Sequence, residues 1–144
     1  MKTVSMLLQQ KGHEVLWIGP DAPVFEALEF MAQKNCGALL VVDQGRLVGI
    51  FSERDYARKI ILKGKTSKDT PVREIMTSDV VCIATERSLD DCMALMTGKR
   101  IRHLPVLEEG KLVGVISIGD VVKAVISEQE FIIEQLQSYI TGGY

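Results

Sequence analysis

A serine followed three residues later by an aspartate occurs twice at the end of an apolar run that begins Leu-Val-Gly. The pairs are Ser52 with Asp55 and Ser117 with Asp120. A strand that ends in a hydroxyl and leads into a helix offers free backbone N–H groups that suit a phosphate. A carboxylate only accepts hydrogen bonds, so an aspartate pairs naturally with the two donor hydroxyls of a ribose. The two motifs therefore indicate a site for a ribose-bearing ligand.

The same spacing also has a purely structural interpretation. A serine at the N-cap with an acidic residue three positions later is close to a capping box, and aspartate is favourable in the first turn of a helix. Either motif alone is explained at least as well by helix capping. Because both occur at matching positions of a longer repeat, the ligand-binding interpretation is favoured over capping alone.

That repeat is visible at an offset of 65 residues, the spacing between Ser52 and Ser117. Residues 15–60 align with residues 80–125 without a gap, and the aligned positions share apolar or charged character well beyond the motif. A unit of roughly 50 residues buries too little surface to be stable alone, so we expect the two copies to pack on each other.

Each copy predicts the element order β-α-β-β-α. Short β-branched runs precede helices with apolar residues along one face, and two further strands follow, joined by the turns Gln44-Gly45 and Glu109-Gly110. We expect an α/β fold of two repeats with pseudo-twofold symmetry and a C-terminal helix. The predicted segments are a first repeat over 1–63, a linker over 64–71, a second repeat over 72–126 and a helical tail over 127–144 with an apolar stripe.

A shorter echo links the N-terminus to the segment that opens the second repeat. Val4-Ser5-Met6-Leu7-Leu8 resembles Val72-Arg73-Glu74-Ile75-Met76 if about three extra residues after Leu8 are allowed.

Composition excludes several classes of function. The net charge of −2 gives no electrostatic reason to expect nucleic acid or an anionic membrane as partner, and the longest apolar runs have the length of a strand. The first residues lack the features of a signal peptide, so we expect a soluble cytoplasmic protein. Three cysteines without a C-x-x-C pair and two distant histidines argue against a disulfide framework and a metal site. No nucleotide-hydrolysing or protease motif is present, so we do not expect an enzyme.

The repeats resemble a tandem pair of cystathionine β-synthase (CBS) domains, also called a Bateman module. The resemblance covers residues 1–126 and rests on three features: the two Gly-x-x-Ser-x-x-Asp signatures, the Ile-Arg-His-Leu-Pro-Val strand from Ile101, and the Pro-Val-Arg-Glu-Ile-Met-Thr segment from Pro71. It implies a non-catalytic regulatory module that binds an adenosyl ligand in clefts between the repeats. The ligands typical of such domains are AMP, ADP, ATP, NAD(H) and S-adenosylmethionine.

The resemblance also implies roles for individual residues. Asp55 and Asp120 would bind ribose hydroxyls, with Ser52 and Ser117 beside the ribose or the phosphate. The base would lie against Ile18, Gly37, Ala38 and Leu39 in the first copy and against Ile83, Thr85, Arg102, His103, Leu104 and Pro105 in the second.

The two copies differ in basic residues, which predicts unequal sites. Arg54 precedes the first motif aspartate where Gly119 precedes the second, and only the second copy has Arg102 and His103 before its central strand. We take Arg54, Arg102 and His103 as phosphate-binding candidates, with Lys59 behind them. Three structural alternatives stay open: a solvated basic rim, a buried structural role for His103, and a helical ion pair between Asp55 and Arg58 or Lys59.

The function expected from the sequence is therefore regulatory. The module would bind an adenine nucleotide and signal through its conformation, as a homodimer or through a separate effector protein. The alternative is a structural or protein-interaction module in which both motifs only cap helices and no nucleotide binds.

Overall fold

The computed structural model describes residues 2–141 and divides into two compact units. One unit is the uninterrupted segment Val15–Val81, which we call the continuous unit. The other combines the N-terminal residues up to Glu14 with the segment from Cys82 onward, and we call it the composite unit. Each unit contains one of the two repeated motifs, Ser52 to Asp55 or Ser117 to Asp120, and is described by itself.

The continuous unit is a three-stranded sheet with helices. Its elements in order are β1 (Trp17–Ile18), α2 (Val24–Lys34), β2 (Ala38–Asp43), β3 (Arg46–Ser52), α3 (Glu53–Tyr56), the π-helical turn η1 (Ala57–Ile61) and α4 (Val72–Ile75). The sheet order is β1-β2-β3, in which β1 runs parallel to β2 and β3 runs antiparallel to it.

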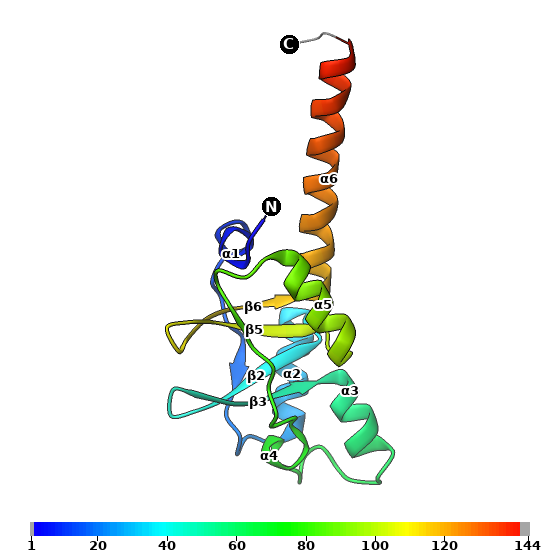
Figure 1. The fold of residues 1–144 in the computed structure, drawn as a ribbon. Helices are drawn as coiled ribbons and strands as arrows, with labels where there is room; N and C mark the ends of the chain where they lie inside the picture. Colours follow the sequence, from blue (N-terminus) through cyan, green and yellow to red (C-terminus); the bar gives the residue numbers. More distant parts are fainter. Residues whose placement is uncertain (1, 142–144) are drawn as a thin grey trace. The chain divides into compact units, whose positions relative to one another are not determined.

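The composite unit has the same plan. Its elements are α1 (Val4–Lys11), β4 (Ile83–Ala84), α5 (Leu89–Lys99), β5 (His103–Glu108), β6 (Lys111–Ser117) and α6 (Ile118–Thr141), with sheet order β4-β5-β6. The predicted α/β class, the order β-α-β-β-α and the C-terminal helix are confirmed. The last helix of the second repeat and the predicted tail form one helix, α6, which extends well past the strands of its own unit (Figure 1).

Turn chemistry accounts for the matching hairpins. Both predicted turns have positive φ at their two central residues, 51° and 80° at Gln44 and Gly45 and 51° and 78° at Glu109 and Gly110. Two successive positive φ angles are typical of the type I′ turn, whose twist matches that of antiparallel strands. The turn sets the first pairs of each hairpin, and a register shift of one residue between Val41 and Val42, and between Val106 and Leu107, then places Ala38 opposite Ser52 and His103 opposite Ser117.

Each unit has its own apolar core. In the continuous unit, Val24, Ala27 and Met31 from one face of α2 pack against Val41 and Phe51 of the sheet, and all are at most 3% exposed. The equivalent helix α5 buries Leu89, Cys92 and Met96. The spacing of these helical positions is the three-to-four-residue period that the sequence predicted.

Helices α1 and α4 occupy equivalent places in the two units, as the sequence echo predicts. The Val4 amide donates to the carbonyl of Arg87 at 2.9 Å, and the Val72 amide donates to the carbonyl of Ala22 at 2.8 Å. Residues 2–14 thus fold with the second repeat, and α4 folds with the first. The predicted bounds of the two repeats, 1–63 and 72–126, stay a prediction. Each compact unit also includes a segment from outside its own repeat.

Candidate functional site

The first motif forms a complete capping box. Ser52 is the N-cap of α3: its Oγ accepts a hydrogen bond from the Asp55 amide at 3.3 Å, and Oδ2 of Asp55 accepts from the Ser52 amide at 3.0 Å. The Ser52 hydroxyl also donates to Oδ2 at 3.1 Å. The structural interpretation of the motif is therefore correct for this copy, because the aspartate satisfies the start of its own helix.

The other carboxylate oxygen of Asp55 is also engaged. Its Oδ1 accepts from Thr77 Oγ1 at 3.2 Å and lies 3.3 Å from Nζ of Lys59, which also donates to the carbonyl of Ile75. Asp55 is only 8% exposed. The helical ion pair between Asp55 and Lys59 that the sequence left open is thus present, and a ribose would have to displace or share these partners.

The second motif has the same capping geometry but a more open carboxylate. The Ser117 amide donates to Oδ2 of Asp120 at 2.8 Å, and the Asp120 amide donates to Ser117 Oγ at 3.1 Å. The Asp120 side chain is 28% exposed. Within residues 2–141 its Oδ1 has no hydrogen-bond partner, so this oxygen can accept from a ligand hydroxyl without breaking a contact.

Lys11 supplies the cation at the second motif. Its Nζ lies 2.5 Å from Oδ2 of Asp120 and 2.6 Å from the carbonyl oxygen of Val115. In the continuous unit these two contacts are made by Thr77, whose amide donates to the carbonyl of Ile50 and whose hydroxyl donates to Asp55. A single ammonium group therefore does in one repeat what a backbone amide and a hydroxyl do in the other.

His103 lies near Asp120 and is held in its neutral form at neutral pH. It pairs with Ser117 across the β5–β6 ladder. Burial lowers the pKa of His103, and the positive charges of Lys11 and Arg102 lower it further, against the opposing effect of Asp120. Partial burial alone would raise the pKa of Asp120, but hydrogen bonds from Lys11 and the Ser117 amide outweigh it and keep that pKa below the ordinary value. The site holds an ionised carboxylate among basic groups.

The two copies differ at the position before the motif aspartate, as predicted. Arg54 is exposed, and Gly119 has only the Ser117 hydroxyl near the position of an added Cβ, at 3.7 Å. Arg102 is exposed, and its carbonyl accepts from the Ile118 amide at the start of α6. The Arg102 backbone is thus held at the start of α6, and the Lys11 side chain lies on Asp120.

Only some of the predicted base-binding residues lie beside a motif within their own unit. Ala38 pairs with Ser52, and the carbonyl of Gly37 accepts from the Glu53 amide at 3.1 Å. Ile18 instead pairs with Val41, three residues farther along β2, or about 10 Å away. Ile83 is placed in the same way opposite Val106.

The side chains of the remaining predicted base-binding residues are mostly buried, so these residues would contact a ligand mainly through backbone atoms. Thr85 has its carbonyl occupied by the Ser5 amide at 2.9 Å. The side chains of Leu39, Leu104 and Pro105 are buried.

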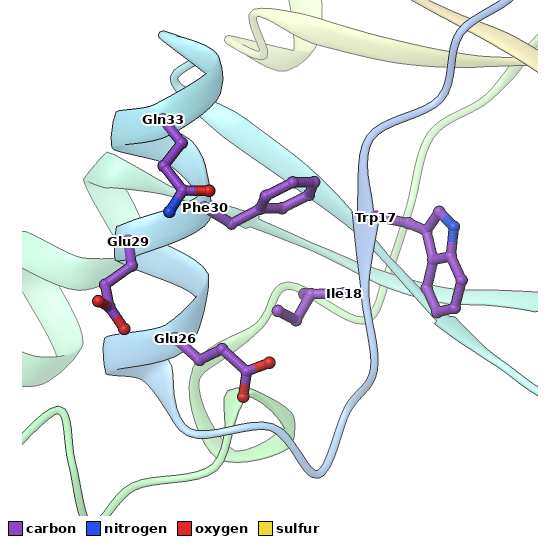
Figure 2. A pocket seen from close by; sticks show the side chains of 6 residues that line it. All are labelled: Trp17, Ile18, Glu26, Glu29, Phe30 and Gln33. Carbon is purple, nitrogen blue, oxygen red and sulfur yellow. The ribbon is translucent and has the colours of Figure 1, made fainter.

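A hollow of about 360 Å³ adjoins Ile18 but is not suited to phosphate. It lies between β1 and α2, where Figure 2 shows Ile18 and Phe30 pointing into the same space and the Trp17 ring on the other side of the strand. Glu26, Glu29 and Gln33 complete the lining. Its two carboxylates would repel an anion, so a phosphate would not bind in this hollow.

A second hollow, of about 290 Å³, includes one predicted residue, Gly37, together with Cys36 and Glu53. Burial raises the pKa of the Cys36 thiol, so the thiol is held in its neutral form at physiological pH.

A family comparison identifies the repeats. The model of the CBS domain matches residues 12–62 and 72–127. The chain belongs to the CBS-domain family. It is 42% identical to the mitochondrial CBS domain-containing protein CBSX3 of Arabidopsis thaliana, over 99% of this chain and 73% of that protein.

Solved CBS structures have the same fold. A putative signal-transduction protein with CBS domains from Burkholderia ambifaria is 49% identical, with a TM-score of 0.86 over 89% of this chain and 96% of that one. The crystal structure of the CBS domain NE2398 is 54% identical, with a TM-score of 0.84 over 87% and 98%. None of the helices in residues 2–141 is long and apolar enough to cross a membrane. The cytoplasmic location stays a prediction.

The sequence missed two of the residues around the motifs, Lys11 and Thr77. Both lie just after the echoed segments that form α1 and α4, so the echo was the available signal. Because about three extra residues follow Leu8, an alignment of the two segments does not pair Lys11 with Thr77.

Proposed function

We propose that this CBS-domain pair is a non-catalytic regulatory module that binds an adenine nucleotide, with Asp120 accepting hydrogen bonds from the ribose. The observation that carries the proposal is the partly exposed Asp120 carboxylate beside Lys11, whose Oδ1 has no hydrogen-bond partner within residues 2–141. A ribose offers two adjacent donors and a nucleotide offers phosphate, so acceptor and cations match the two ends of one ligand.

The charge at this site narrows the ligand class. Lys11 pairs with this carboxylate and Arg102 adds a second positive charge beside His103, so an anionic ligand such as AMP, ADP, ATP or NAD(H) gains attraction that a sulfonium cation does not. S-adenosylmethionine carries such a cation and is expected to bind this site less well. Asp55, with both oxygens engaged by its own unit, is the weaker ribose site of the two.

A thermal-shift screen with AMP, ATP, NADH, adenosine and S-adenosylmethionine tests the proposal. A ligand present at 100 times its dissociation constant stabilises the native state by about 2.7 kcal/mol, which moves the melting temperature by several degrees. We expect the anionic nucleotides to raise the melting temperature more than adenosine or S-adenosylmethionine does. The absence of a shift with every adenosyl compound would refute the proposal.

The structural alternative is supported by one specific observation. Both motifs form capping boxes, and Asp55 satisfies its helix start, Thr77 and Lys59 without any ligand. A module that only mediates protein contacts would need nothing more from these residues. It predicts that Asp120→Asn changes stability slightly and changes no ligand response, because asparagine retains a capping oxygen.

Homodimer formation and an effector protein, both predicted from the sequence, are part of this proposal. A regulatory module without chemistry of its own must transmit the bound state through its shape or its partners. The conformational difference between the free and bound states would be the signal that a partner reads.

A further inference from the structure

Helix α6 carries an apolar stripe that its own unit leaves uncovered. Val121 and Ala124 face the core of the composite unit and are at most 8% exposed. Farther along the helix, Ile133 is 53%, Leu136 56% and Ile140 80% exposed. Soluble proteins rarely expose a contiguous apolar patch of this extent without a partner.

The spacing along the stripe is that of a coiled coil. The positions alternate steps of four and three residues from Ile118 through Val122, Val125, Gln129, Ile132 and Leu136 to Tyr139. This is the a and d pattern of a heptad, which favours a second helix as the covering surface over a flat sheet or a rigid pocket. Ile126, Ile133 and Ile140 widen the stripe on one side.

We propose that α6 is a self-association helix, which pairs with α6 of a second copy of this chain along this seam. The seam has one polar residue, Gln129, near its middle, and a carboxamide can both donate to and accept from its own equivalent. A single polar residue at an a position fixes register and oligomeric state in helix pairs. This inference does not depend on nucleotide binding.

The exposed area is sufficient for a stable contact. Eight large apolar side chains of the stripe are each at least 40% exposed: Ile118, Val122, Ile126, Ile132, Ile133, Leu136, Tyr139 and Ile140. Together they present several hundred Å² in each copy, on the order of the 800 Å² that one partner buries in a standard interface.

Charge argues against a membrane as the covering surface. After Lys123, the described part of α6 contains Glu128, Glu130 and Glu134 and no basic residue. Helices that lie on anionic membranes have lysine and arginine on their polar face. The polar face of α6 would be repelled by such a surface, whereas the apolar seam needs no opposite charge in its partner.

Sedimentation velocity of the full chain at micromolar concentrations tests the inference with two matched variants. Leu136→Glu places a charge in the seam, and Phe131→Glu places the same charge at a similarly exposed residue about 140° around the helix. We expect wild type and Phe131→Glu to sediment as the same oligomer. Leu136→Glu should raise the dissociation constant at least about 100-fold, since each copy would bury an unpaired carboxylate.

Circular dichroism confirms that both variants remain folded, as the exposure of Leu136 leads us to expect. A monomeric wild type, an equal mass for all three proteins, or equal dissociation by both variants would overturn the inference. Binding to anionic lipid vesicles that Leu136→Glu abolishes would also overturn it, because the seam would then be a membrane surface.

Discussion

The Nζ atom of Lys11 lies 2.5 Å from Oδ2 of Asp120, which ties the N-terminal helix to the second repeat motif across 109 positions of sequence. The same atom donates to the carbonyl of Val115 at 2.6 Å. A ligand that takes Asp120 as its ribose acceptor therefore meets the ammonium group directly. Lys11 is the last residue of α1, so such a ligand would contact the C-terminal end of that helix.

Replacement of Lys11 by methionine should destabilise the composite unit by about 1 kcal/mol, the usual net worth of a partly buried charged hydrogen bond. Asp120 and the carbonyl of Val115 would each lose a donor. Urea unfolding with an unchanged m-value measures the difference. Lys63→Met, at an exposed position, is the control and should lie within about 0.5 kcal/mol of wild type. Equal stability of the two variants would contradict the role given to Lys11.

The signature glycines should differ in their tolerance of alanine. A Cβ at Gly49 would lie 2.6 Å from Met76 Sδ and 3.0 Å from the carbonyl oxygen of Thr77, whereas at Gly114 it would meet only the end of the Leu8 side chain, at 2.8 Å. A backbone oxygen cannot move aside as a leucine methyl can. Gly49→Ala should therefore lower the free energy of unfolding by about 1–3 kcal/mol. Gly114→Ala should lower it by less.

Gly98 provides the opposite control for this pair. It lies in α5 with no atom within 4 Å of an added Cβ. Gly98→Ala should stabilise the fold, by up to about 1 kcal/mol, because alanine is the better helix former. Thermal or urea unfolding of the three variants gives the order, and a Gly49→Ala protein as stable as wild type would exclude close packing of α4 on β3.

Stability should fall as the pH drops below the ordinary histidine pKa of about 6.5, in part because of His103. Its pKa is lowered in the folded state by burial and by Lys11 and Arg102, so the unfolded chain binds more protons in this range. The free energy of unfolding therefore increases as the pH rises from the folded-state pKa of His103 to about 6.5. It decreases again as the pH falls through the same range. His103→Gln should flatten the profile between about pH 7 and pH 5. An unchanged slope in the variant would assign the dependence to other groups.

Local patterns in the sequence predicted most of the fold. The hairpin turns at Gln44 and Glu109, the apolar faces of α2 and α5 and the Asp55–Lys59 ion pair all depend on residues a few positions apart. Contacts between distant segments could not be read in this way. Thr77 reaches Asp55 only because its backbone pairs with Ile50, and Lys11 reaches Asp120 only because α1 folds with the second repeat.

The predicted site residues fall into two groups for the same reason, according to which strand pairing positions them. The motif residues and the start of β2 are brought together by the register of the hairpin, which depends on the turn and on the shift of one residue between Val41 and Val42. Ile18 and Ile83 are held three residues farther along the sheet by the parallel pairing of β1 and β4, a register that no turn residue specifies. The resemblance to CBS domains predicted these positions, but a single chain's sequence contains no signal for a parallel register.

Calorimetric titration with AMP and with 2′,3′-dideoxy-AMP tests the central claim most directly, because the two ligands differ only in the ribose hydroxyls. Wild type should bind AMP and lose most of this affinity with the dideoxy analogue, by at least roughly 100-fold for two hydrogen bonds to a charged acceptor. Asp120→Asn should bind both ligands equally weakly, and Asp55→Asn should retain most of the wild-type preference. Equal affinity of wild type for the two ligands, or a preference for AMP that survives Asp120→Asn, would contradict ribose recognition by Asp120.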